Sequence, residues 1–172
     1  WKDEQRKSLA RARQRTQERV DQSAADIDSL ALAEAAAKVQ AARDSMAGAA
    51  YQALMSSYDQ TLEHLTNETR DYQFAKSRGD EAYYFYKRSV HDGKEDLKQK
   101  SKLQENETEM AKRQEVIKVL EVQRDSILSL INVYRSNLRN AQNEHTDLLK
   151  KVEKWQTKLK RLDGAPIEIK QV

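Results

Sequence analysis

The chain has 172 residues, of which 34% are charged and 38% hydrophobic, with four glycines, one proline, no cysteine and a formal net charge of +3. A mean hydropathy of −0.97 excludes an ordinary globule with a large central core, and the scarcity of glycine and proline argues against a disordered linker. Without cysteine there is no disulfide or thiolate chemistry, and no run of about 18 apolar residues exists to span a membrane.

The first part of the chain predicts one long helix over residues 1–77. Residues 6–19 are basic, with six Lys and Arg side chains against Glu18 alone, and no glycine or proline occurs before Gly48. Residues 31–53 are rich in alanine, the best helix former. Alanine also lets a neighbouring backbone approach closely, so this middle segment either packs tightly or simply has high helix propensity.

A heptad pattern of apolar residues becomes clear from Tyr51 onward. Nine of its twelve positions are apolar or aromatic: Tyr51, Met55, Tyr58, Leu62, Leu65, Thr69, Tyr72, Lys76, Gly79, Tyr83, Tyr86 and Val90. Extended backwards, the same frame predicts a weaker seam that meets Val20, Ile27, Leu30, Glu34, Ala37, Ala41, Asp44 and Gly48. A 3.5-residue period of this kind is typical of helices that supercoil against a partner.

A longer heptad pattern predicts a second helix over residues 95–162. Thirteen of its sixteen positions are apolar or aromatic: Met110, Arg113, Ile117, Leu120, Arg124, Ile127, Ile131, Tyr134, Leu138, Ala141, His145, Leu148, Val152, Trp155, Leu159 and Leu162. We expect the coiled-coil seam to run through Ile117, Leu120, Ile127, Ile131, Tyr134, Leu138, Leu148, Val152, Trp155 and Leu159.

The two patterns do not join, because the interval from Val90 to Met110 is one residue short of three heptads. We interpret this slip as a chain reversal within residues 78–94, where Gly79 and Gly93 lie close to aspartates. A short helical aromatic segment, Tyr83, Tyr84, Phe85 and Tyr86, would then form the tip. The predicted fold is all-α, a long antiparallel helical hairpin or coiled coil, and an intermolecular bundle is the competing product.

Residues 163–172 are predicted to form an extended C-terminal tail. Gly164 and Pro166 are a standard helix stop, and the alternation from Ile167 to Val172 is strand-like. Because six residues of strand are not stable alone, this segment either pairs with a partner, continues into a further domain or is a frayed end.

No motif in the sequence indicates catalysis, a metal or a cofactor. His64, His91 and His145 are far apart, and neither a phosphate-binding loop nor a nucleophile elbow is present. We therefore expect a protein that is not an enzyme. The seam residues Arg113 and Arg124 either fix the register of the helices or extend past the seam to solvent, and the register role is favoured for Arg124.

Three short motifs are weaker signals. Arg78-Gly79-Asp80 matches an adhesion tripeptide in the predicted turn. Asn67-Glu68-Thr69 and Asn106-Glu107-Thr108 match the glycosylation sequon within predicted helix. We interpret the first as turn chemistry and the other two as chance matches.

Positive charge is concentrated at the start of the first predicted helix and at the end of the second, where residues 150–161 carry six basic side chains and one acidic side chain, Glu153. A hairpin would bring residues 6–19 and 150–161 to the same basic end. The residues proposed to bind an acidic partner there are Arg6, Arg11, Arg13, Arg15, Arg19, Lys150, Lys151, Lys154 and Lys158. Lysines in a last helical turn also complement the helix dipole, whereas arginines at a helix start do not.

These features favour a structural or interaction protein, a coiled-coil arm, stalk or scaffold that binds other protein subunits, either copies of itself or different chains. The first alternative is a binder of nucleic acid or anionic membrane through the basic end. The second is a receptor-binding hairpin that uses the aromatic tip, since tyrosines are enriched at recognition sites.

Overall fold

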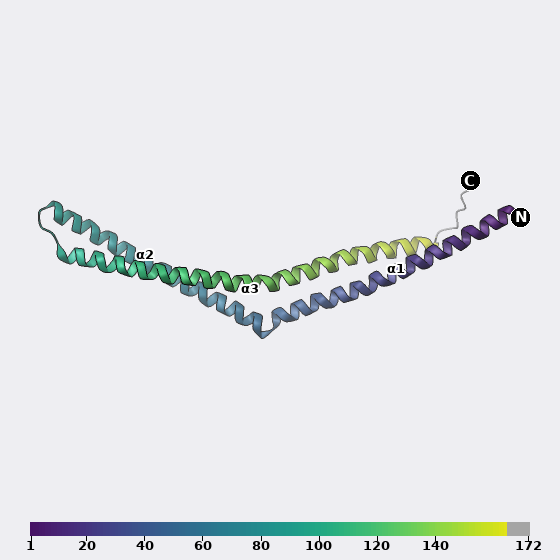
Figure 1. Cartoon of the computed structure of the whole chain (residues 1–172), viewed down its shortest axis with the longest axis horizontal. Coiled ribbons are helices and arrows are strands. Elements are labelled where there is room, and N and C mark those ends of the chain that lie inside the picture. Colours follow the sequence, from purple (N-terminus) through teal and green to yellow (C-terminus); the bar gives the residue numbers. More distant parts are fainter. Residues whose placement is uncertain (165–172) are drawn as a thin grey trace. The chain divides into compact units, whose positions relative to one another are not determined.

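A computed structural model of the chain describes Trp1 to Gly164, and the regular elements in this range are three α-helices. They are α1 (Lys2–Ala47), α2 (Ala49–His91) and α3 (Leu97–Gly164), as Figure 1 shows. The predicted all-α class is confirmed for the described residues. The helix predicted over residues 95–162 corresponds to α3, which continues to Gly164 rather than ending at Leu162. The rest of the predicted extended tail lies outside the described residues. No helix in the described part of the chain has an apolar stretch that could cross a membrane.

The helices pack into two compact units that share α3. In one unit, α2 packs against the first part of α3, up to Val133. In the other, α1 packs against α3 from Tyr134 onward.

The unit made by α2 and α3 is an antiparallel hairpin. Arg78 donates hydrogen bonds to Asn106 and Glu109, while ten residues earlier Glu68 accepts hydrogen bonds from Arg113. Partners therefore move forward along α3 as they move back along α2. The hairpin geometry predicted from the sequence is present in this unit.

The turn between α2 and α3 covers residues 92–96 rather than beginning at residue 78. Gly93 takes the left-handed conformation with φ of +76°, Lys94 N donates to the carbonyl of Ser89, and Gly93 N donates to that of Val90. This bond pair is the glycine-terminated helix end known as the Schellman motif. Asp96 then caps α3, because its side chain accepts hydrogen bonds from the backbone N–H groups of Lys98 and Gln99.

The prediction that the first helix ends at residue 77 was wrong for a packing reason. Gly79 is buried inside α2, and a Cβ built on it would lie 3.5 Å from the Cβ of Asn106. This glycine lies at the contact with α3, where a Cβ would make an ordinary van der Waals contact, and it does not break the helix. The interruption lies earlier, at Gly48, whose extended backbone (φ −73°, ψ 162°) separates α1 from α2. The aromatic segment is consequently part of α2 rather than a separate short helix.

The contact stripe of α3 follows the heptad positions read from the sequence. All sixteen positions from Met110 to Leu162 are buried or half-buried, and between them only Leu128 is also shielded. Ile131, the largest fully buried side chain, is completely inaccessible, while its neighbour Leu130 is 54% exposed.

The contact stripe of α2 includes every predicted frame position up to Leu65 and differs from the frame at alternate positions from Thr69 onward. Thr69, Lys76, Tyr83 and Val90 are exposed, whereas the preceding residues are shielded. The observed stripe contains Tyr51, Leu54, Met55, Tyr58, Thr61, Leu62, Leu65, Glu68, Tyr72, Ala75, Gly79, Ala82, Tyr86 and Ser89. It includes small residues that permit close packing and a glutamate that has an arginine partner. Ser89 is a whole number of heptads from Met110, so the phase slip inferred from Val90 does not exist, although the chain does reverse.

The unit made by α1 and α3 is also antiparallel. Asp21 pairs with Lys158, Asp28 with Trp155, and Lys38 with Glu144. The contact stripe of α1 is Glu18, Asp21, Ala25, Asp28, Leu32, Ala35, Val39, Ala42 and Met46. The seam predicted through Val20, Ile27 and Leu30 was wrong, because these residues are exposed. The prediction followed the large apolar residues, which lie on the outer face of α1. The contact stripe on its inner face instead contains several alanines and two aspartates.

The start of α1 has no described part of α3 opposite it. Only six residues of α3 follow Lys158, the partner of Asp21. Continued over those residues, the antiparallel register reaches α1 near Arg15. Figure 1 accordingly shows the first turns of α1 extending past the end of the α3 ribbon.

Candidate interaction surfaces

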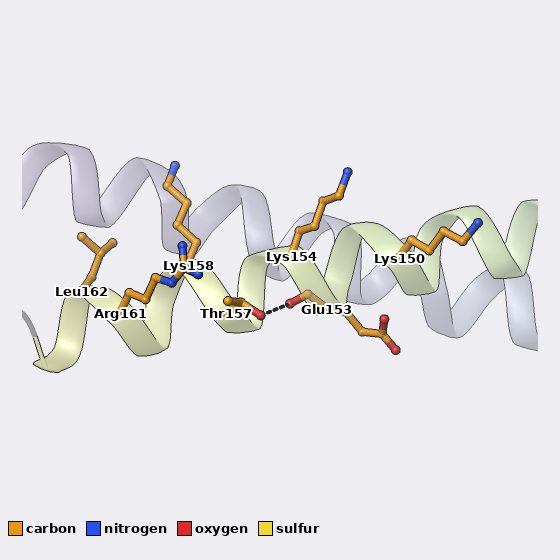
Figure 2. A pocket seen from close by; sticks show the side chains of 7 residues that line it. All are labelled: Lys150, Glu153, Lys154, Thr157, Lys158, Arg161 and Leu162. Carbon is orange, nitrogen blue, oxygen red and sulfur yellow. Dashed lines mark hydrogen bonds between the residues drawn. The ribbon is translucent and has the colours of Figure 1, made fainter.

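A basic groove lies along the last turns of α3. It is lined by Lys150, Glu153, Lys154, Thr157, Lys158, Arg161 and Leu162, and Figure 2 shows these side chains following one another along the helix. The basic residues recur at helical spacing, which places their charges on one side of α3. The groove is open to solvent, so it suits contact with an extended acidic surface rather than enclosure of a small molecule.

Two acidic residues of α1 form polar contacts with side chains near this end of α3. The indole nitrogen of Trp155 donates to Asp28 at 2.6 Å. The Nζ of Lys158 lies 3.1 Å from Asp21 and 5.0 Å from the centre of the Trp155 ring. Lys158 is therefore already paired within the unit, while Lys150 and Lys151 are exposed.

Asp21 is the most deeply placed acidic group of this cluster, with 5% of its surface exposed. A hydrogen bond from Gln17 at 3.0 Å and the Lys158 ammonium lower the pKa of this carboxyl, against an opposing effect of burial. The carboxylate is thus held in its charged form at the contact between α1 and α3.

The structure brings only the edges of the two basic segments together, because the register that pairs Asp21 with Lys158 places Arg19 near Lys160 and leaves Arg6 beyond the described end of α3. Asp21 lies opposite Lys158, so the residues opposite 150–158 on α1 come after Asp21 in the sequence. The arginines of the other segment, all exposed, lie on the first turns of α1: Arg6, Arg11, Arg13, Arg15 and Arg19. The sequence-based prediction did not include this offset, because it assumed that the start of the first helix and the end of the second lie at the same height.

A charged cluster at the contact of α2 and α3 contains Arg113. Its guanidinium bonds both oxygens of Glu68, at 3.0 and 2.9 Å, and lies 3.6 Å from Asp71 and 3.7 Å from Glu109. The hydrogen bonds with Glu68 are the main cause of a raised pKa at Arg113. Arg124, favoured for the register role, pairs instead with its neighbour Asp125. The geometry therefore fits Arg113, which links two helices, better than Arg124.

The aromatic segment of α2 divides into an inner and an outer part. Tyr86 is half-buried, and its hydroxyl donates to Glu95 at 2.7 Å, which raises the pKa of Tyr86 and lowers that of Glu95. Tyr83, Tyr84 and Phe85 are exposed. Tyr86 therefore holds the turn closed, while the other three rings remain accessible to a partner.

The adhesion-like tripeptide does not lie in a turn. Arg78, Gly79 and Asp80 are inside α2, Gly79 is buried, and Arg78 is bonded to α3. The tripeptide is thus part of the contact between the two helices.

Two helix faces carry large apolar side chains that are exposed in the described structure. On α1 they are Val20, Ile27 and Leu30, with a shallow groove lined by Thr16, Arg19, Val20, Ser23, Ala24 and Ile27. On α3 they are Val116, Val119, Val122, Leu130 and Val133. On α1 the contact stripe includes small residues such as Ala25, Ala35 and Ala42, whereas on α3 it carries large apolar residues such as Ile131.

Over residues 1–164, no three His, Asp or Glu side chains converge in a way that could hold a metal ion. Comparisons of the chain with protein-family models, with curated proteins and with solved structures gave no significant match.

Proposed function

We propose that this chain is a non-enzymatic structural protein, a coiled-coil component that holds protein subunits together in a larger assembly. The observation that carries the proposal is the heptad contact stripe of α3, which is shielded at all sixteen positions over its length. Such a stripe stabilises long helices through a narrow line of buried side chains rather than a wide core. The outer faces of the helices therefore remain available for partners.

The polar contacts support the same proposal. Arg113 with Glu68, and Lys158 with Asp21, join different helices. Arg113, Glu68 and Asp21 occupy contact-stripe positions where apolar side chains are usual, and Lys158 reaches Asp21 from beside the stripe. Polar pairs at such positions fix register and partner choice at some cost in stability. A scaffold requires a defined register, because its outer residues must stand at fixed distances.

The basic groove supports a second candidate function, the binding of nucleic acid or an anionic membrane. Lys150, Lys154 and Arg161 lie on one side of α3 around an open groove, and the charge is complementary to phosphate. Because such binding depends on counterion release, its affinity falls steeply as salt rises.

One experiment separates the two candidates. The full chain, tagged and cross-linked in cells of its source, is purified at low and at high salt, and bound protein, nucleic acid and lipid are quantified. The scaffold proposal predicts stoichiometric protein partners cross-linked to outward residues of the helices and retained at high salt. The second candidate predicts nucleic acid or anionic lipid that is lost at high salt and in a Lys150→Gln/Lys154→Gln variant. Absence of any stoichiometric protein partner would contradict the scaffold proposal.

A further inference from the structure

The outer face of α1 has a heptad frame of its own. Its ten positions are all exposed: Arg13, Thr16, Val20, Ser23, Ile27, Leu30, Glu34, Ala37, Ala41 and Asp44. From Thr16 onward each lies one or two residues before a position of the contact stripe, which at 3.6 residues per turn places the frame about 150° around the helix from α3. The two largest side chains of the frame, Ile27 and Leu30, are 68% and 65% exposed.

This frame is complementary to itself when the helix is reversed. With Ile27 of one copy beside Leu30 of the other, every remaining position meets another position of the frame. The resulting layers are Ser23 with Glu34, Val20 with Ala37, Thr16 with Ala41, and Arg13 with Asp44. The apolar residues form the middle of the contact, and opposite charges meet at both of its ends.

Parallel pairing of the same face would be unfavourable. It would place Arg13 beside Arg13, Glu34 beside Glu34 and Asp44 beside Asp44, and like charges facing each other across a helix pair are destabilising. Reversal replaces the Arg13 and Asp44 clashes with attractive pairs. The alanines that flank the frame, Ala24 and Ala31, add no charge and permit close approach.

We propose that the outer face of α1 binds the outer face of α1 in a second copy of this chain, antiparallel and two-fold symmetric. A second copy is the occupant that the charge pattern supports, because in the reversed helix Arg13 meets Asp44 at both ends and Ile27 meets Leu30 at the centre. The dimer rests on the coiled-coil architecture proposed above, since α1 must be held on α3 by its inner face for its outer face to be presented.

The first test uses the absence of cysteine from the chain. Thr16→Cys and Ala41→Cys variants are prepared separately, mixed in equal amounts and oxidised mildly. The antiparallel dimer predicts a disulfide that joins one copy of each variant, whereas either variant alone forms little covalent dimer. Each variant carries a single cysteine, so the bond cannot form within a chain. Covalent dimers of Thr16→Cys alone at equal yield would overturn the arrangement.

A charge swap tests the same pairing without covalent chemistry. Light scattering after size exclusion measures the dimer. We expect Asp44→Arg to raise the dissociation constant of the dimer about tenfold, because Arg13 then faces a second arginine. Arg13→Asp has the matching effect, and the double variant restores the affinity. A chain that remains monomeric at high concentration, or a double variant that stays weak, would overturn the proposal. Circular dichroism of each variant separates these outcomes from failure of the coiled coil, because helicity is retained when only the dimer is lost.

Discussion

Individual polar residues decide where the helices of this protein meet. Asp21 occupies a position of the contact stripe that an apolar side chain usually fills, and it remains charged there because Gln17 and Lys158 both donate to it. A buried carboxylate without such partners would be strongly destabilising. The contact between α1 and α3 therefore depends on the ionisation of this residue.

This dependence predicts a specific response to acid. Because the pKa of Asp21 is lowered in the folded protein, its contribution to stability is present above the ordinary carboxyl pKa and is lost as pH falls through the lowered value. Thermal unfolding followed by circular dichroism should show Asp21→Asn less stable than the wild type at pH 7, with the difference shrinking toward low pH. Asp26→Asn is the control, because Asp26 accepts an equivalent bond from Gln22 but is exposed and forms no ion pair with another helix over residues 1–164. Equal effects of the two variants at pH 7 would contradict the role of Lys158.

At the scale of the element, one glycine lies inside a helix and another ends it. Gly79 lies inside α2 at the contact with α3, with ordinary space around a Cβ. Gly93 closes the helix in a left-handed conformation that side chains rarely adopt. The same residue type thus has opposite roles within fourteen residues of sequence.

The same substitution at these two positions should therefore have opposite effects. Gly79→Ala is expected to stabilise the protein by about 0.5–1 kcal/mol, because alanine has the higher helix propensity and its Cβ fits. Gly93→Ala is expected to destabilise it by about 1–2 kcal/mol through the left-handed backbone. Urea denaturation measures both values. Destabilisation by Gly79→Ala would mean that α2 and α3 are closer at this point than the structure has them.

Heptad periodicity predicted α3 almost completely and α1 and α2 only in part. On α3 the shielded positions carry large apolar residues, so the pattern is unambiguous. On α2 the residues of the alternating heptad steps could be assigned in two ways that differ by one residue. The large residues Tyr83 and Val90 favoured one assignment, whereas the shielded residues are Ala82 and Ser89. On α1 the large apolar residues are on the outer face. Sequence alone could not reveal these choices, because they depend on how closely α3 approaches and on partners such as Arg113.

The interaction surfaces were predicted less well than the fold class, for a related reason. The basic residues of the α3 groove were identified from charge alone, and Lys150 and Lys154 are exposed there. Their association with Arg6 and Arg13 required the antiparallel register, which is fixed by contacts such as that of Lys158 with Asp21. Charge density is visible in a sequence, but the alignment of two helices is not.

At the scale of the whole molecule, one helix contributes to both units. α3 contacts α2 in its first part and α1 in its second, and the same heptad phase continues through both. The fold described above requires that this single stripe on α3, rather than general helix propensity, stabilises the folded chain. Ile131 and Leu130 provide the comparison, since they are adjacent in one helix and differ mainly in burial.

The most direct measurement is the free energy of unfolding of Ile131→Ala and Leu130→Ala, both determined by urea denaturation followed by circular dichroism. Because alanine favours helix at either position, differences between the variants report packing and not propensity. We predict that Ile131→Ala lowers the free energy of unfolding by about 2–5 kcal/mol, whereas Leu130→Ala changes it by less than about 0.5 kcal/mol. Equal losses at the two positions, or a larger loss at Leu130, would contradict the heptad contact on which the fold and the proposed function depend.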